Sequence, residues 1–334
     1  MSGLDDITTP ALLVDSAALD RNLDVMAQKW PGRTLRPHVK AHKTTAIARR
    51  QAQRGHTGFT CATTREIEVM AAAGLGDDLL LANEVVDMRR LGVVANAGAR
   101  VTVAIDSDAT LQAAVAGGVR EVLIDVNVGL PRCGCPPDHA GAVADRARAA
   151  GLEVRGVMGY EGHLMHEPDE AQRLSQTAQA MSLLAQAHAA VGGDIVSGGG
   201  TGTWTANHGV TELQAGSYAL MDTTYRGLAD LPFEQALTVL ATVISVGDGW
   251  AVADAGLKAF GMDEGNPRLP GFSIWYCSDE HVVFSSDEGD LPKVGDRVRL
   301  EPAHIDPTCA LHERMHVVDG DSVIETWPID MRGW

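Results

Sequence analysis

The stretch VTVAIDSDATLQAAVAGGVREVLIDVN, residues 101–127, decides the fold class of this chain. It begins and ends with short runs of β-branched and aliphatic residues, at 101–106 and 121–127, which are typical of buried strands. The alanine-rich segment between them has the length and composition of a helix. A strand, a helix and a second strand in this order predict the crossover unit of a parallel α/β fold.

The same alternation continues through the first two thirds of the chain. Candidate strands can be placed at 35–40, 58–63, 78–83, 101–106, 121–127, 154–162, 194–200 and 211–218. This pattern predicts a (β/α)8 barrel, whose active site lies at the carboxyl ends of the strands. The last connection is too short for a full helix, and a doubly wound open sheet stays the alternative because strand number alone does not prove closure.

The pattern changes after about residue 232. Short strand-like runs separated by Gly-Asp turns replace the helical segments, and no clear helix is visible. We therefore expect an α/β protein in which the (β/α)8 barrel is followed by a smaller, mostly β C-terminal domain.

Composition excludes several kinds of partner. The 334 residues include 27 basic and 44 acidic side chains, a formal net charge of −17, which disfavours nucleic acid and anionic membranes as partners. No apolar run approaches the ~20 residues of a membrane span, and the acidic start MSGLDDITTP does not resemble a secretory signal. The five cysteines, an odd number, fit reduced thiols. We expect a cytoplasmic enzyme.

Two of the few lysines, Lys40 and Lys43, lie in RPHVKAHK at residues 36–43. They stand at and just beyond the end of the first expected strand, next to two histidines and an arginine. Cationic neighbours lower the pKa of an amine and make it nucleophilic, as a Schiff-base lysine requires. A basic loop that binds an anion, or simply solvated charge, is the alternative.

A glycine-rich loop, SGGGTGT at 197–203, follows the seventh expected strand, and AGSY at 215–218 follows the eighth. Glycines let backbone N–H groups approach an anion closely. Barrels often build phosphate sites from the loops after these two strands. A lysine on the first strand and a phosphate cradle of this kind are the layout of a pyridoxal phosphate site. A tight turn at a strand end is the structural alternative.

A third signal is PAHIDPT at 302–308, in which His304 and Asp306 are two residues apart. On a strand, both side chains would project from one face. One imidazole and one carboxylate suit a moderately hard divalent cation such as Mn²⁺ or Mg²⁺. A hydrogen-bonded His–Asp pair at a strand end is the simpler alternative.

In order along the whole chain, several segments resemble the D-threonine aldolase/D-serine dehydratase family of alanine-racemase-like pyridoxal phosphate enzymes. They are TPALLVD, RPHVKAHK, DVNVGLPRCG, SGGGTGT, LQAGSYALMD, SDEH, PAHIDPT and WPIDMRGW. The resemblance implies a homodimer whose second domain takes its first strand from the N-terminus. The implied boundaries are 16–228 for the barrel that binds the cofactor, and 1–15 plus 229–334 for the β domain that carries the metal ligands.

The resemblance also assigns roles to individual residues. Lys40 is implied to form the Schiff base with the cofactor, and Tyr160 and His166 to act on the substrate hydroxyl, with His163 as a competing base. The implied cofactor contacts are Arg132, Thr201, Gly216, Ser217 and Tyr225. The implied metal ligands are His304 and Asp306. One departure from the family pattern is Ala62, which stands where some aldolases have a glutamine.

The metal motif discriminates within the family, since the dehydratases have His-x-Cys, which favours Zn²⁺, and the aldolases have His-x-Asp. Asp306 therefore favours a metal-dependent lyase that cleaves D-β-hydroxy-α-amino acids to glycine and an aldehyde. A D-serine or D-threo-3-hydroxyaspartate dehydratase, which would release a 2-oxo acid and ammonia, is the alternative. An amino-acid racemase of this fold would need a second base, usually a tyrosine from the β domain of the partner subunit. Tyr276 is the one tyrosine in that domain, and a racemase would leave the His304–Asp306 pair unexplained, so this alternative is less favoured. A non-catalytic cofactor-binding protein of this fold would lack that domain. Mn²⁺ or Mg²⁺ is the expected metal, with Zn²⁺ as the alternative.

Overall fold

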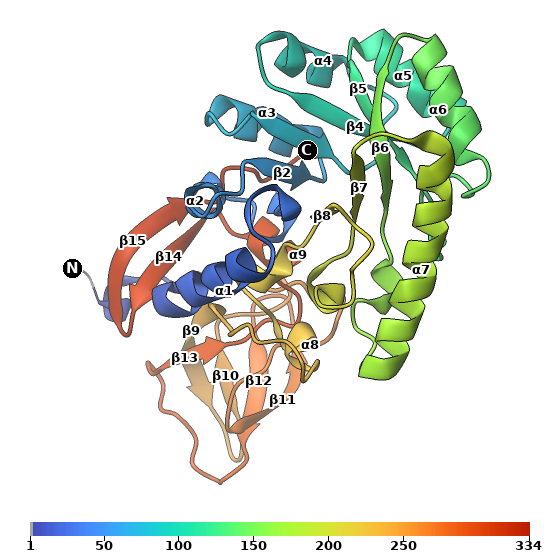
Figure 1. The fold of residues 1–334 in the computed structure, drawn as a ribbon. Coiled ribbons are helices and arrows are strands. Elements are labelled where there is room, and N and C mark those ends of the chain that lie inside the picture. Colours follow the sequence, from blue (N-terminus) through green and yellow to red (C-terminus); the bar gives the residue numbers. More distant parts are fainter. Residues whose placement is uncertain (1–2) are drawn as a thin grey trace. The chain divides into compact units, whose positions relative to one another are not determined.

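The computed structural model describes residues 3–334, which form two compact units (Figure 1). The barrel unit comprises Met26–Lys40, Ile47–Gly216 and Gly333–Trp334. The β unit comprises the chain up to Val25 together with Ala41–Ala46 and Ser217–Arg332. Helix α1 (Ser16–Lys29) passes from the β unit into the barrel unit.

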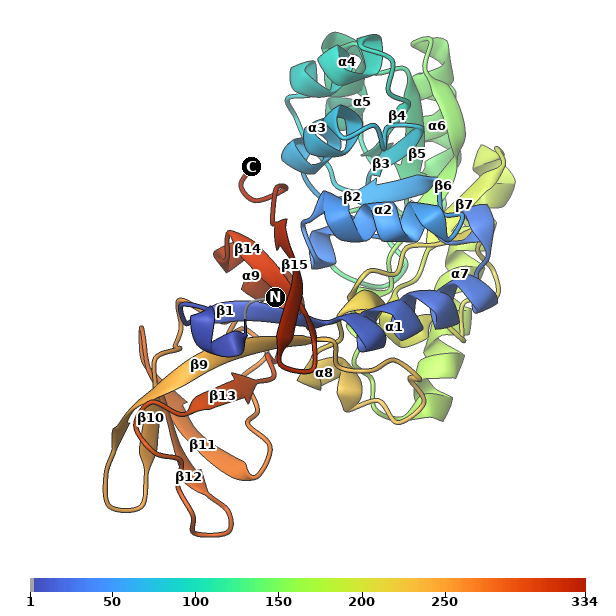
Figure 2. The same cartoon turned by 90° about the vertical axis from the view of Figure 1, so that its left-hand side faces the viewer.

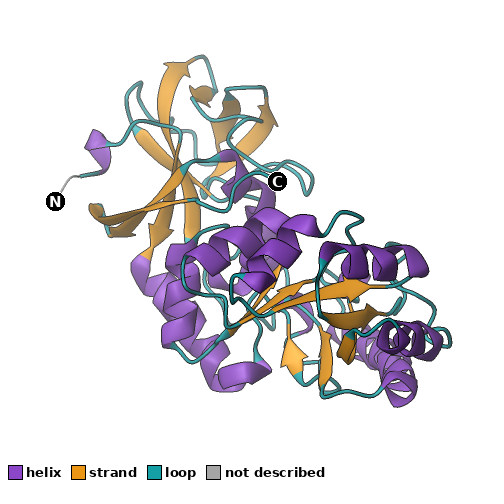
Figure 3. Ribbon diagram, turned by 90° about the horizontal axis from the view of Figure 1, so that it is seen from above, coloured by secondary structure: helices purple, strands orange, loops and turns teal. Residues whose placement is uncertain are grey.

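The barrel unit is built on a parallel sheet whose strands follow one another in chain order. They are β2 (Gly58–Cys61), β3 (Asp78–Leu81), β4 (Val101–Ile105), β5 (Glu121–Asp125), β6 (Glu153–Gly159), β7 (Ile195–Gly198) and β8 (Glu212–Leu213). Figure 3 shows the helices of this unit packed around its strands. These helices are α2 (Thr45–Gln53), α3 (Thr64–Ala72), α4 (Arg89–Asn96), α5 (Asp108–Gly117), α6 (Ala140–Ala149) and α7 (Glu170–Val191).

Residues 35–38 close this sheet into a barrel. The N–H groups of Arg36 and His38 donate to carbonyls 213 and 215 after β8, at 2.9 and 3.0 Å. On the other side, the Thr60 N–H on β2 donates to the carbonyl of Pro37 at 2.9 Å. The barrel prediction is confirmed and the open-sheet alternative is wrong. The expected strand at 35–40 is reduced to isolated bridges, because Pro37 has no N–H to donate and the chain turns into a 3₁₀ helix at Val39–Ala41.

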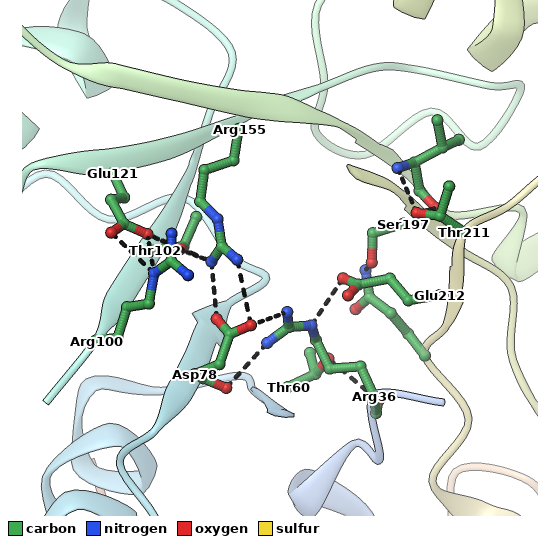
Figure 4. Close-up of polar contacts among 12 residues, drawn as sticks. Arg36, Thr60, Asp78, Arg100, Thr102, Glu121, Arg155, Ser197, Thr211 and Glu212 are labelled. Atoms are coloured by element: carbon green, nitrogen blue, oxygen red, sulfur yellow. Dashed lines mark hydrogen bonds and ion pairs between the residues drawn. The ribbon is translucent and has the colours of Figure 1, made fainter. Parts of the chain in front are cut away.

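The amino-terminal end of the barrel is filled by charged side chains (Figure 4). Arg36 donates to Glu212 at 2.7 Å and to the carboxylate of Asp78 at 2.8 Å. Arg155 donates to the second oxygen of Asp78 at 2.7 Å. Burial alone would raise the pKa of Asp78, but the hydrogen bond from Arg155 and the charge of Arg36 outweigh it and hold that pKa well below the usual range. Buried charges require such partners, and these ion pairs supply them at this end of the barrel.

The β unit contains one mixed sheet with the order β11-β12-β10-β9-β1-β14-β15, in which β13 also pairs with β9. The strands are β1 (Ala11–Asp15), β9 (Leu237–Val246), β10 (Ala251–Ala253), β11 (Phe272–Cys277), β12 (Val282–Ser286), β13 (Arg297–Leu300), β14 (Arg314–Asp319) and β15 (Ser322–Pro328). Figure 2 shows β1 between β9 and β14, parallel to β14 and antiparallel to β9. The N-terminal segment TPALLVD thus contributes β1 to the sheet of the β unit.

Two short helices, α8 (Thr223–Arg226) and α9 (Ile305–Leu311), belong to the β unit. The sequence predicts no clear helix after residue 232, and this expectation is wrong at α9, which begins where the His304–Asp306 pair was considered on a strand. Pro307 lies in the first turn of α9, where proline is tolerated because its missing N–H has no intrahelical partner. His304 therefore caps a helix instead of continuing a strand. Among the described residues, no helix is both long and apolar enough to span a bilayer.

Candidate functional site

Six of the ten predicted site residues follow barrel strands at their carboxyl ends. Lys40 follows the bridge residues 35–38, Arg132 follows β5, Tyr160 and His166 follow β6, Thr201 follows β7 and Gly216 follows β8. Because the carboxyl ends of parallel strands meet at one end of a barrel, the topology gathers these residues on one rim. Ser217, Tyr225, His304 and Asp306 belong to the β unit.

The loop after β5 brings Arg132 to Tyr160. Asn127 Nδ2 donates to the carbonyl of Leu130 at 2.8 Å, and an isolated bridge between Val126 and Cys135 closes the base of the loop. The Arg132 guanidinium carbon then lies 5.2 Å from the centroid of the Tyr160 ring, within the range of a cation–π contact. An arginine held over a tyrosine in this way presents N–H donors at the rim, as contact with a phenolic oxygen requires.

The two candidate histidines on the loop after β6 have different surroundings. His163 lies against the loop after β5, since a Cβ placed on Gly129 would come within 3.1 Å of its Cε1. It also lines a surface groove beside Gln172 and Gln176 of α7. His166 is exposed and does not line that groove. Both histidines are exposed, and the two differ in that His163 lies against Gly129 and lines the groove.

The glycine-rich loop is shaped by Glu161, a buried carboxyl that the sequence analysis does not single out. One Glu161 oxygen accepts from the Gly199 N–H at 3.3 Å. The other accepts from the Thr203 hydroxyl at 2.7 Å and from Asn207 Nδ2 at 2.5 Å. Burial raises the pKa of Glu161, and these hydrogen bonds oppose the rise. Glu161 thus fixes the loop that begins its 3₁₀ turn at Thr201.

The same loop has no room for side chains at two of its glycines. A Cβ on Gly200 would lie 2.6 Å from the sulfur of Met165, and a Cβ on Gly202 would lie 2.0 Å from the Met165 carbonyl oxygen. The backbone of the loop is therefore closely packed against Met165. The N–H groups of Gly199 and Gly200 already donate to Glu161 and to the Thr203 hydroxyl, so the start of the 3₁₀ turn at Thr201 is where the loop could present donors to an anion. Such a donor set fits a phosphate group.

A pair of carboxyls, Asp125 and Glu84, lies at the same rim and is also not singled out by the sequence analysis. Asp125, the last residue of β5, forms a hydrogen bond with Glu84, which follows β3. Burial, and then the negative charge of Glu84, raise the pKa of Asp125 well above its usual range. When two carboxyl groups are in contact, the state in which they share one proton is favoured over the state in which both are ionised. The pair therefore adds a proton-holding group beside the Arg132 loop without adding two full negative charges.

In the β unit, Asp222 links the turn that carries Tyr225 to the turn that carries the predicted metal ligands. One carboxylate oxygen of Asp222 accepts from the Tyr225 N–H at 3.0 Å, and the other accepts from the Ile305 N–H at 3.1 Å. Burial raises the pKa of Asp222 to about 6. The Thr224 hydroxyl adds a hydrogen bond to the carbonyl of Ala303 at 2.7 Å. Helix α8 and residues 302–305 are thus held together.

The predicted metal pair lies at the start of α9. His304 Nε2 and Asp306 Oδ2 are 3.7 Å apart, with His304 extended at the N-cap position and Asp306 in the first turn of the helix. Ligand atoms at about 2.0–2.2 Å from one divalent ion lie roughly 3–4 Å from each other, so this separation fits a shared cation. The carboxylate oxygens of Asp263 and Glu264 lie within 4.8 Å of a ring nitrogen of His304. The nitrogen of His304 and the carboxylate oxygen of Asp306 form a suitable donor pair for Mn²⁺ or Mg²⁺.

Two family models match the chain. The model for the alanine racemase N-terminal domain matches residues 14–224, and the model for a putative serine dehydratase domain matches residues 236–318. A D-threonine aldolase of Arthrobacter sp is 36% identical, over 98% of this chain and 93% of that protein. A 3-hydroxy-D-aspartate aldolase of Paracoccus denitrificans is 34% identical, over 100% of this chain and 95% of that protein.

Solved structures give the same grouping. The crystal structure of D-threonine aldolase from Filomicrobium marinum superposes with a TM-score of 0.92 at 36% identity, and the match covers 98% of this chain and 96% of that one. The D-threo-3-hydroxyaspartate dehydratase from Delftia sp. HT23 superposes with a TM-score of 0.88 at 28% identity, over the full length of both chains. Aldolases and a dehydratase therefore share this fold across its whole length.

Proposed function

Because the chain belongs to the family that contains the D-threonine aldolases and the 3-hydroxyaspartate aldolases and dehydratases, we propose that it cleaves D-β-hydroxy-α-amino acids to glycine and an aldehyde. The observation that carries the choice of reaction is the His304–Asp306 pair, with 3.7 Å between nitrogen and carboxylate oxygen. The thiol of Cys309 does not take the place of Asp306 in this pair, since Cys309 is three residues further along α9 and its side chain is buried.

Pyridoxal phosphate is the cofactor of this enzyme class, and its ring, when bound, supplies the electron sink that stabilises the carbanion left by Cα–Cβ cleavage. Lys40 would hold its aldehyde carbon, and Arg132 would donate to its phenolic oxygen. The phosphate would be held by the two loops after β7 and β8 and by α8, through Thr201, Gly216, Ser217 and Tyr225. The support for this assignment is the donor-rich, close-packed glycine loop at the rim.

His304 and Asp306 would hold a divalent cation, Mn²⁺ or Mg²⁺ in preference to Zn²⁺, and such a cation lowers the pKa of a hydroxyl that it binds. His166 would accept the proton of the substrate β-hydroxyl as general base, with Tyr160 helping to orient that hydroxyl. The contact of His163 with Gly129, away from His166, supports this assignment. The small-molecule partner would be a D-amino acid with a β-hydroxyl group. A homodimer and a cytoplasmic location remain predictions from the sequence.

Product analysis tests the proposal against its alternative. The purified protein, loaded with pyridoxal phosphate and Mn²⁺, should convert D-threonine or D-threo-3-hydroxyaspartate to glycine and an aldehyde in equal amounts. A D-serine or 3-hydroxyaspartate dehydratase would instead release a 2-oxo acid and ammonia. Lys40→Ala should abolish the reaction and the visible absorption of the bound cofactor, whereas Lys43→Ala should keep the absorption. Ammonia and a 2-oxo acid in place of glycine would contradict the proposal, whereas the glyoxylate that cleavage of 3-hydroxyaspartate releases is accompanied by an equal amount of glycine.

A further inference from the structure

The loop at residues 261–264 is built against the turn that carries the predicted metal ligands. The backbone of His304 forms an antiparallel bridge with Gly261, whose N–H donates to the Thr308 hydroxyl at 2.9 Å. That hydroxyl donates in turn to the carbonyl of His304 at 2.6 Å. A side chain at Gly261 is excluded, since a Cβ there would lie 2.1 Å from Cγ of Pro307. This close approach places Asp263 beside the His304 ring.

The contact between Asp263 and His304 defines which ring nitrogen carries the proton. His304 Nδ1 lies 2.7 Å from Asp263 Oδ2. An ionised carboxylate can only accept a hydrogen bond, so Nδ1–H is the donor. In the neutral ring the lone pair is then on Nε2, which is the nitrogen that lies 3.7 Å from Asp306 Oδ2. The ring is therefore held in the tautomer that leaves Nε2 available to a cation.

The distances from the His304 ring to Asp306 and to Asp263 also distinguish a metal ligand, Asp306, from a residue that supports a ligand, Asp263. A separation of 3.7 Å leaves space for a cation bound to both Nε2 and the Asp306 oxygen. A separation of 2.7 Å is a hydrogen bond and leaves no such space between Nδ1 and Asp263. The rival arrangement is a cation bound directly by Asp263, Glu264 and His304, whose ligand atoms lie within 4.8 Å of one another. It would require Nδ1 to give up its hydrogen bond.

We propose that Asp263 is a positioning residue that orients His304 through Nδ1–H, so that Nε2 and the Asp306 carboxylate face the same divalent cation. The inference rests on the proposed metal pair. Carboxylate partners of metal-binding histidines fix the ring and strengthen its basicity, and their removal typically weakens metal binding about 10–100-fold.

The test is an Mn²⁺ titration of the chelator-treated protein that still holds pyridoxal phosphate, with free Mn²⁺ measured by electron paramagnetic resonance. Asp263→Ala should raise the Kd about 10–100-fold. Asp263→Asn should keep the Kd within a few-fold of the unmodified protein, because an amide oxygen also accepts from Nδ1–H. The matched control Glu264→Gln should leave the Kd unchanged, and Asp306→Asn should weaken binding more than Asp263→Ala does. Thermal unfolding checks that each variant is folded.

The outcomes separate this inference from the proposed function. Wild-type Kd for Asp263→Ala, together with lost binding for Asp306→Asn, would overturn the positioning role alone. Equal losses for Asp263→Ala, Asp263→Asn and Glu264→Gln would show the rival site, in which the acids bind the cation directly. The expected order of Kd values in a protein that forms a 2-oxo acid would uphold the positioning role and contradict the proposed reaction. A protein that binds no Mn²⁺ would overturn both.

Discussion

Replacing Arg36 by methionine should destabilise the barrel strongly, because it removes the central cation from the charged network at the amino-terminal end (Figure 4). Arg36 makes three hydrogen bonds, to Glu212 at 2.7 Å and to the carboxylate and carbonyl of Asp78 at 2.8 and 2.9 Å. The Arg36 side chain is 4% exposed, and those of Asp78 and Glu212 are 11% and 8% exposed. Removing one partner of a buried ion pair costs about 3–5 kcal/mol.

A loss of that size is a large fraction of the roughly 5–15 kcal/mol that stabilises a folded domain. Urea unfolding followed by far-ultraviolet circular dichroism at pH 7 measures it as a lower unfolding midpoint for Arg36→Met. The matched control is Arg89→Met, because the pair of Arg89 with Asp87 is exposed, with side-chain exposures of 82% and 57%. Exposed pairs contribute little, so the control should keep the wild-type midpoint.

The wild-type protein and Arg36→Met should also differ in how their stability depends on pH. The pKa of Asp78 is depressed in the folded protein, despite burial, by Arg155 and Arg36. A depressed carboxyl pKa adds stability above its unfolded value of about 4, and that stability is lost as the pH falls toward the folded value. Without Arg36 the depression is smaller, so the stability difference between wild type and Arg36→Met should shrink from pH 7 to pH 3. A wild-type midpoint for Arg36→Met, or a difference that does not change with pH, would refute this reasoning.

Three further predictions concern the rim of the barrel. Glu161→Gln should weaken pyridoxal phosphate binding by about tenfold or more, as measured by equilibrium dialysis of the cofactor. The loss of charge weakens the hydrogen bonds from Thr203 and Asn207, and the new amide N–H₂ faces the Gly199 N–H, which is also a donor. His166→Ala should lower kcat for aldehyde release about 10²–10⁴-fold, as loss of a general base does, whereas His163→Ala should leave kcat near wild type; the reverse order would assign the base to His163. D-threonine and D-allo-threonine should both be cleaved, since the cation needs only to reach a hydroxyl, and comparable turnover of L-threonine would contradict the assignment of substrate class.

Local patterns were sufficient to predict the alternating strands and helices of the barrel, but not its closure. The strand–helix–strand unit at 101–127 is β4, α5 and β5, and the segments around it alternate in the same way. Closure depends on residues 35–38, which form bridges with β8 and β2 but no regular strand. The sequence predicted a strand at 35–40. The structure forms only isolated bridges there, followed by a 3₁₀ helix at Val39–Ala41, and this outcome depends on tertiary context.

The sequence predicted the site less completely than the fold. His304 and Asp306 were singled out by spacing and resemblance, but the spacing was interpreted on a strand, and the helix α9 changes how the pair is held. The supporting acids have no periodic signal. Asp222 and Ile305 are 83 residues apart in the chain, and Asp263 and His304 are 41 apart, so the folded structure is needed to find these contacts. Glu161 lies directly after Tyr160 in a segment already singled out, and burial in three dimensions reveals its role.

Aldehyde release from D-threonine by chelator-treated protein that keeps its pyridoxal phosphate tests the central claim most directly. The claim is that the cation held by His304 and Asp306 is required for cleavage, whereas the cofactor is held by other residues, Lys40 and the loops after β7 and β8 among them. A site with one nitrogen and one carboxylate is open and should be emptied readily by a chelator. The account predicts that chelation abolishes glycine and aldehyde formation without changing the cofactor absorption, and that Mn²⁺ restores the activity at least as well as Zn²⁺. Full glycine formation by a rigorously metal-free sample would contradict it.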